Sequence, residues 1–193
     1  MSAYHTPLSE PYVLAVNVSA GGIPKLPQAT AQVQCAGLKG DGRNHTKHIR
    51  PDRAISLWDY EILEQLVAEG FSKLVPGAAG ENLTVRGINI QSLEPGTLLR
   101  IGLVLLKLEQ PRKPCYVLDA IDPLLKDVIV GRCGYLASVV TEGVIRPGMT
   151  IQTLSPHVAI TGRAVMEPAA AGDLAGSLAN APSYLLPASP VSS

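Results

Sequence analysis

Apolar residues recur along this chain in short runs, and glycine and proline residues separate most of the runs. Short apolar or alternating runs between such turn residues are typical of β-strands. Two runs, at residues 98 and 149, begin within two residues of a Pro-Gly pair. The runs predicted as strands are residues 12–18, 29–35, 82–86, 98–101, 103–108 and 149–154. This pattern predicts a mainly β fold, a barrel or a sandwich.

A further pair of runs, 135–140 and 144–145, flanks Thr141-Glu142-Gly143 and predicts a hairpin. One segment has helical periodicity instead. Ser56 and Asp59 have the spacing of a capping box, which marks the start of a helix. The predicted helical segment runs from Trp58 to Gly70, and Gly70 suits the position just after the last helical turn. Its apolar stripe comprises Trp58, Ile62, Leu63, Leu66 and Val67, and we expect Trp58 to anchor the core.

Two shorter segments follow the proline-rich stretch near residue 114. A short helix is expected from Pro114 or Tyr116 to Ile121. Residues 123–129 fit a helix or a strand equally well, because the run is too short for its periodicity to decide.

Length and composition favour one β-rich domain over residues 1–167 and a flexible tail over 168–193, where Asp173 is the one charged residue. The formal net charge of zero and the lack of a long apolar run favour neither nucleic acid nor a membrane as a partner. Three widely separated cysteines, and first residues unlike a secretory signal, predict a cytoplasmic protein.

Cys115 has the surroundings of a working thiol. It follows Arg112 and Lys113, and Pro111 and Pro114 end the preceding strand and stiffen the turn. Nearby positive charge favours the thiolate, which is the nucleophile and the metal ligand. The alternative is a small core residue, since free cysteine is commonly buried. Cys35 lies in an alternating run and is expected to point into the core.

Three further polar clusters are candidates for a site. Asp41, His45 and His48 lie in a glycine-rich segment that could hold a metal, wrap a phosphate with backbone N–H groups, or be a solvated loop. Glu81 and Asn82 follow two glycines at the entrance of a strand, where Glu81 could also be a simple turn residue. The third cluster, residues 131–135, contains Arg132, which could clamp an anion. Lys25 adds a further glycine-flanked cation.

Taken in order, these pieces resemble a MOSC domain, the family named for the C-terminal domain of molybdenum cofactor sulfurase. The resemblance runs from about Val13 to Thr153 and is closest to the small stand-alone bacterial members. The segments that carry it are 37–41 followed by a histidine, 53–57, Pro-Gly-Ala-Ala-Gly-Glu-Asn-Leu-Thr at 76–84, 93–96, 101–102, Gln-Pro-Arg-Lys-Pro-Cys at 110–115, 134–135 and 143–148.

The resemblance implies a MOSC-type β-barrel with a few appended α-helices and a molybdenum cofactor (molybdopterin). Cys115 falls at the family position that ligates the metal or carries sulfur. Because the cofactor has an anionic phosphate, the candidates for holding it are Lys25, Arg53, Arg112 and Arg132. Candidates for pterin contacts or the pocket wall are Asp41, His45, His48, Glu81 and Asn82.

Three functions follow as hypotheses. The first is a molybdenum-dependent oxidoreductase that transfers oxygen atoms or reduces N-hydroxylated small molecules, with Cys115 as the catalytic metal ligand. The second is a non-catalytic cofactor carrier or a sulfur relay with a Cys115 persulfide. Three scattered cysteines cannot build a Cys₄ iron–sulfur cluster, so we expect a separate electron or sulfur donor protein. The third keeps the barrel, leaves Asp41, His45 and His48 to bind zinc or nothing, and makes Cys115 a core residue.

Overall fold

The structure, a computed structural model, describes residues 10–42 and 50–155. Its strands are β1 (Tyr12–Val18), β2 (Leu26–Gln28), β3 (Ala31–Gln34), β4 (Gly37–Leu38), β5 (Ile55–Asp59), β6 (Leu83–Arg86), β7 (Leu98–Ile101), β8 (Val104–Pro111), β9 (Tyr135–Thr141), β10 (Gly143–Ile145) and β11 (Gln152–Leu154). The helices are α1 (Tyr60–Ala68) and α2 (Leu125–Val128), with short 3₁₀ turns η2 (Pro51–Arg53), η3 (Ile90–Ser92) and η4 (Tyr116–Ala120). The predicted mainly β fold is confirmed.

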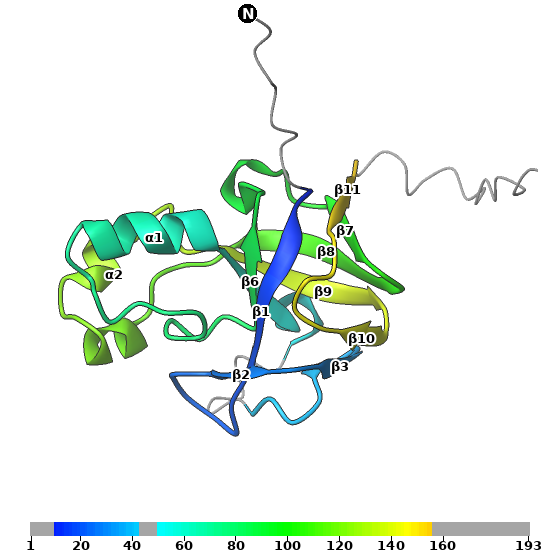
Figure 1. Ribbon diagram of the computed structural model, residues 1–193, viewed down its shortest axis with the longest axis horizontal. Coiled ribbons are helices and arrows are strands. Elements are labelled where there is room, and N and C mark those ends of the chain that lie inside the picture. Colours follow the sequence, from blue (N-terminus) through cyan, green and yellow to red (C-terminus); the bar gives the residue numbers. More distant parts are fainter. Residues whose placement is uncertain (1–9, 43–49, 156–193) are drawn as a thin grey trace, which may run out of the picture. The chain divides into compact units, whose positions relative to one another are not determined.

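Eight strands form one curled sheet in the order β11-β7-β8-β9-β5-β6-β1-β2 (Figure 1). All neighbours are antiparallel except β5 and β6, and α1 makes the crossover that a parallel pair requires. The sheet closes on itself beside β11. Val13 donates its N–H to Met149 O (2.9 Å), Gly148 donates to Val13 O (2.8 Å), and Ile151 donates to Pro11 O (2.7 Å). These bonds pair β1 with the segment that leads into β11, so the curled sheet has the form of a barrel.

Two apolar clusters meet at β5. Ile55 and Leu57 face the barrel interior, whereas Trp58 faces a second cluster that contains Leu66 of α1 and Leu125 of α2. The two helices lie together at one side of the barrel (Figure 1). The Trp58 indole N–H donates to Arg132 O (2.7 Å), which satisfies its polar atom in a fully buried setting. Trp58 is therefore the core anchor that the sequence predicts.

The predicted helix start at Trp58 is wrong. Residues 55–59 form β5, and α1 begins at Tyr60. Asp59 is the residue before the helix but makes no side-chain capping bond, and its Oδ1 accepts a hydrogen bond from the Ile90 N–H (3.3 Å) instead. Pairing with β6 and β9 outweighs the local capping pattern. At the other end of the helix Gly70 has a φ of +112°, as expected for the residue after a helix. Val67 is 37% exposed and so does not belong to the buried apolar stripe in which it was predicted.

The hairpin expected around Thr141-Glu142-Gly143 is also wrong. β10 pairs with β3, with Val144 opposite Gln32, and joins the separate three-stranded sheet β10-β3-β4. Cys35 is exposed and does not point into the core. Ala31 and Val33 continue the inward alternation of β3, but the strand ends at Gln34 and the chain turns into β4 before Cys35 can follow them.

Both segments after Pro114 that were open to a short helix contain helical turns. The 3₁₀ turn η4 occupies most of the segment predicted as a short helix. In the ambiguous run 123–129, residues 125–128 are helical, as α2. Across 10–42 and 50–155, none of the helices combines the length and apolar character needed to cross a membrane. The predicted domain boundary at residue 167 and the tail 168–193 lie outside the described residues.

Asp59 gives the fold a pH dependence. Burial raises the pKa of its carboxyl group to about 7, despite backbone hydrogen bonds from Ile90 and Gln91 that oppose the shift. The folded chain therefore holds a proton between about pH 4 and pH 7 that the unfolded chain has released. Stability from this group is complete below that window and is lost as the pH rises through it.

We predict that Asp59→Asn flattens this dependence, because a neutral amide has no charge to bury. The wild-type free energy of unfolding should fall from pH 4 to pH 7 by a few kcal/mol more than that of the variant, on the scale of about 1.4 kcal/mol per pKa unit. Urea titrations at several pH values measure the difference. Parallel curves for the two proteins would contradict the assignment.

Candidate functional site

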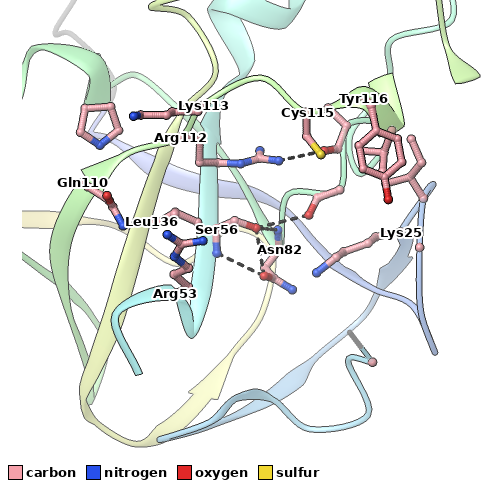
Figure 2. Close-up of a pocket in the computed structure, with 17 residues that line it drawn as sticks. Lys25, Arg53, Ser56, Asn82, Gln110, Arg112, Lys113, Cys115, Tyr116 and Leu136 are labelled. Carbon is pink, nitrogen blue, oxygen red and sulfur yellow. Dashed lines mark hydrogen bonds between the residues drawn. The ribbon is translucent and has the colours of Figure 1, made fainter. Parts of the chain in front are cut away.

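A pocket of about 520 Å³ opens where the end of β8 meets three loops. The loops are the segments around residues 22–25, 79–82 and 112–117, and the short turn at Arg53 closes a further side. The lining residues are Gly22, Ile23, Lys25, Gly42, Arg53, Ser56, Ala79, Gly80, Asn82, Gln110, Pro111, Arg112, Lys113, Cys115, Tyr116, Val117 and Leu136 (Figure 2). Segments far apart in the sequence thus converge on one cavity.

Cys115 lines the wall of the pocket and is half-buried. The strand β8 ends at Pro111, and the Arg112 N–H donates to Gly134 O (2.8 Å), which fixes the start of the segment that carries the thiol. Cys115 itself is extended, and its carbonyl accepts a hydrogen bond from the Leu118 N–H (3.0 Å) at the start of η4. Backbone bonds on both sides give the sulfur a defined position.

Four cationic side chains line the pocket: Lys25, Arg53, Arg112 and Lys113. No aspartate or glutamate is among its described lining residues. Figure 2 shows the charged ends of Lys25, Arg53 and Arg112 pointing inward, whereas Lys113 extends away from Cys115. The site therefore has the electrostatics of an anion-binding pocket.

Two of these guanidinium groups keep unused donors. Arg112 Nη2 donates to Ala79 O (2.9 Å), but Nη1 is buried without a hydrogen-bond partner among the described residues. Arg53 Nε is likewise buried without one, and its ion pair with Asp52 is long, at 3.9 Å. Buried donors without partners are costly, and a bound anion would satisfy them.

Asn82 links the pocket wall to the strands behind it. Its Oδ1 accepts hydrogen bonds from the N–H and the hydroxyl of Ser56 (3.1 and 3.0 Å). Its Nδ2 donates to Asp41 Oδ2 (2.9 Å). Asp41 in turn accepts from Lys25 Nζ (2.6 Å) and from the Ser19 N–H (3.1 Å). The Asp41 carboxylate therefore holds Lys25 at the pocket, and both of its oxygens are already engaged.

Glu81 lies behind the lining residues and is fully buried. Its Oε1 accepts from the Gly77 N–H (2.5 Å) and from the Thr84 hydroxyl (2.9 Å), while Oε2 has no hydrogen-bond partner among the described residues. Burial raises the pKa of this carboxyl group, against the opposing effects of the Gly77 hydrogen bond and the Arg112 charge. Gly77 has a φ of +87°, and a Cβ there would lie 2.2 Å from Lys25 O, so the loop needs glycine at this point.

Two other candidates lie elsewhere or outside the description. Arg132 does not line the pocket, because Glu69 holds its guanidinium through two hydrogen bonds (2.7 and 2.9 Å). It is committed to a structural ion pair rather than to an anion in this cavity. His45 and His48 lie outside the described residues. Within the described part of the chain, no cluster of three or more His, Cys, Asp or Glu residues could hold a metal ion.

The sequence reasoning missed several lining residues. Ser56 was assigned to a helix cap, whereas it belongs to β5 and binds Asn82. Gln110 and Tyr116 also line the pocket. Their closeness in sequence to Cys115 could have predicted this. Cys133 is close enough to Arg112 and Glu81 to interact with both electrostatically, but burial dominates and raises its pKa. It is a core thiol.

Comparison with known proteins agrees with this fold. The family model of the MOSC domain matches residues 44–152. The protein YflK of Bacillus subtilis is 29% identical in an alignment of 143 positions that covers 69% of this chain and 63% of YflK. The protein YiiM of Escherichia coli is 32% identical in an alignment of 152 positions that covers 67% of this chain and 65% of YiiM. This chain thus spans slightly less than two thirds of the length of these relatives.

A solved structure supports the same assignment. YiiM from Geobacillus stearothermophilus superposes with a TM-score of 0.63 at 26% identity, covering 75% of each chain. Because the family model matches more than half of its residues, the chain belongs to the MOSC domain family. The predicted family is confirmed.

We predict that the buried pair of Lys25 and Asp41 stabilises the pocket wall. Their side chains are only 11% and 1% exposed, so Lys25→Met or Asp41→Asn alone should cost about 3 kcal/mol, since each leaves a buried charge without its partner. The double variant should cost clearly less than the sum. Chemical denaturation of the four proteins measures this coupling.

Lys107 and Glu109 provide the matched control. They form a pair of similar length (3.0 Å) whose side chains are 44% and 23% exposed. The same cycle there should give a coupling below about 1 kcal/mol. Equal couplings in the two cycles would show that burial of the Lys25–Asp41 pair contributes nothing.

Proposed function

We propose that this protein binds the molybdenum cofactor in the pocket around Cys115 and supports oxygen-atom transfer or the reduction of N-hydroxylated small molecules. The observation that carries the proposal is one thiol on the wall of a cavity whose described lining residues include four cationic and no acidic side chains. Membership of the MOSC family agrees with a molybdenum-associated role.

The residues present fit such a group. An anionic phosphate matches the unused donors Arg112 Nη1 and Arg53 Nε. A cavity of about 520 Å³ lies within the range of small-molecule and cofactor sites. A thiolate is a soft ligand suited to a thiophilic metal. The thiol, the cations and the volume meet in one cavity, which a structural cysteine would not require.

The roles of the protein's own residues follow from their positions. Cys115 would hold the metal with its sulfur, and Lys25, Arg53 and Arg112 would hold the anionic part. Asn82 and Asp41 keep Lys25 in place. The bound metal would supply two-electron oxygen-atom chemistry. Tyr116, which is exposed beside Cys115 at the pocket wall, would contact a small-molecule substrate.

A second candidate is a cofactor carrier or sulfur relay. The half-exposed position of Cys115 favours it, because a donor protein can reach this sulfur more readily than a buried one. In a relay, the Cys115 thiolate takes the outer sulfur of a donor protein's persulfide, and the donor thiol is released. Either function needs a separate electron or sulfur donor protein, and both are compatible with the predicted cytoplasmic location.

We predict that Cys115→Ser abolishes molybdenum retention. The protein is produced in cells that make the cofactor, and metal content is measured by mass spectrometry after purification. Cys35→Ser is the matched control, because Cys35 is exposed and does not line the pocket. The wild type and Cys35→Ser should retain molybdenum equally, and Cys115→Ser should retain less than about a tenth as much. Equal molybdenum in all three proteins would exclude Cys115 as the ligand.

Two further measurements separate the candidates. Turnover of an N-hydroxylated test compound with a competent reductase supports the oxidoreductase. An extra sulfur on Cys115 in the intact mass, together with no turnover, supports the relay. A wild type with neither molybdenum nor an extra sulfur would contradict both.

A further inference from the structure

Glu81 is a buried carboxyl group with an incomplete set of partners. Its Oε1 accepts two hydrogen bonds, from the Gly77 N–H and the Thr84 hydroxyl, and Oε2 accepts none within the described residues. Neither donor carries a charge. An ionised carboxylate that is fully buried among neutral donors is costly, whereas the protonated group costs far less.

Arg112 is the cation that acts on this carboxyl group. Its charge interacts favourably with the ionised form of Glu81. The same guanidinium is anchored to Ala79 O, two residues before Glu81, and it lines the pocket with Nη1 unused. Arg112 is therefore shared between a buried carboxyl group on one side and the cavity on the other.

A bound anion would change this balance. Without an anion, the Arg112 charge opposes the effect of burial and lowers the pKa of Glu81. With an anion on Arg112, two negative groups would share one guanidinium in a buried setting, and like charges disfavour each other's ionised forms. We propose that binding of an anion to Arg112 in the pocket is accompanied by uptake of a proton on Glu81. The proton comes from solvent, and no bond other than the O–H bond on Glu81 is formed.

The other groups around Glu81 do not take this role. Cys133, from the segment before β9, interacts with Glu81 and Arg112, but burial raises its thiol pKa and so disfavours the thiolate. From β1, Asn17 contributes only its amide group, which donates to the Thr84 hydroxyl (3.1 Å). From the loop before β6, the contact to Glu81 is the backbone N–H of Gly77. Arg112, from the end of β8, supplies the remaining charge.

This inference rests on the proposed function only in taking an anion as the ligand of the pocket. It makes Glu81 a positioning residue that acts through Arg112. The sign follows from linkage: when binding takes up a proton, affinity falls as the pH rises. The pocket should therefore hold a dianion more tightly at pH 6 than at pH 8.

Sulfate is a suitable probe because it does not titrate in this range. Its affinity is measured by isothermal titration calorimetry at constant ionic strength between pH 5.5 and 8.5. For wild-type protein the affinity should fall with rising pH, with a limiting slope of about tenfold per pH unit for one linked proton. In Glu81→Gln, which keeps an oxygen to accept the Gly77 and Thr84 hydrogen bonds, the affinity should not vary with pH. Arg112→Gln should lose sulfate binding.

Asp59→Asn is the matched control. Asp59 is also a buried carboxyl group with a raised pKa, but it does not line this pocket. Its variant should keep the wild-type pH dependence of sulfate binding while changing the pH dependence of stability. A control that lost the dependence would assign the proton to Asp59 and overturn the proposal.

A second measurement needs no folded Glu81 variant. Titration of wild-type protein with sulfate at pH 7 in two buffers of different ionisation enthalpy counts the protons taken up directly. The expected count is positive and between zero and one. Intact sulfate binding without proton uptake overturns the role of Glu81 and leaves the proposed anion pocket standing. Sulfate binding that is absent, or unchanged in Arg112→Gln, overturns the anion pocket as well.

Discussion

The site depends on Asn82, a buried residue that ties together the segments around the pocket. Its backbone N–H donates to Ser56 O (2.8 Å), and its carbonyl accepts from the Asn17 N–H (2.7 Å), so it joins β5 to β1 at the entrance of β6. Its side chain then binds Ser56 on one side and Asp41 on the other. Because Asp41 holds Lys25, the position of a pocket cation is fixed through Asn82 to the barrel. An apolar residue here would leave Ser56 and Asp41 with unmet hydrogen bonds in a buried region.

The arrangement of charge follows from these same contacts. Asp41 lies behind the pocket wall, where its almost fully buried side chain forms an ion pair with Lys25. Its negative charge therefore does not face the cavity. Arg132, which looked equally suited to bind an anion, is paired with Glu69 outside the cavity. Arg53 and Arg112 instead keep buried donors that have no hydrogen-bond partner within the part of the chain that the structure describes. The pocket is positive because its anchoring acids are placed behind the wall and not in it.

Much of the fold could be predicted from the sequence, because short strands between turn residues give a strong local signal. β1 and β7 have the predicted bounds. The errors occurred where long-range pairing decides. The capping pattern at Ser56 and Asp59 is local, but pairing with β6 and β9 makes residues 55–59 a strand. The segment after Thr141 has a hairpin pattern, but pairing with β3 carries it into the other sheet. None of these three partner strands is close in sequence to the strand it pairs with.

The site shows the same division between local and distant information. That Cys115 follows two cations can be read from the sequence. The groups that position the cations come from other segments. The Ala79 carbonyl anchors Arg112, and Asn82 holds the Asp41 carboxylate that binds Lys25. The cysteines illustrate why composition alone cannot settle such a question. Cys115 and Cys133 are near enough to interact electrostatically, yet one lines the pocket and the other is buried beside Trp58 and Leu118. A sulfur reacts only where a partner can reach it, so the barrel's packing selects Cys115 and makes Cys133 part of the core that supports it.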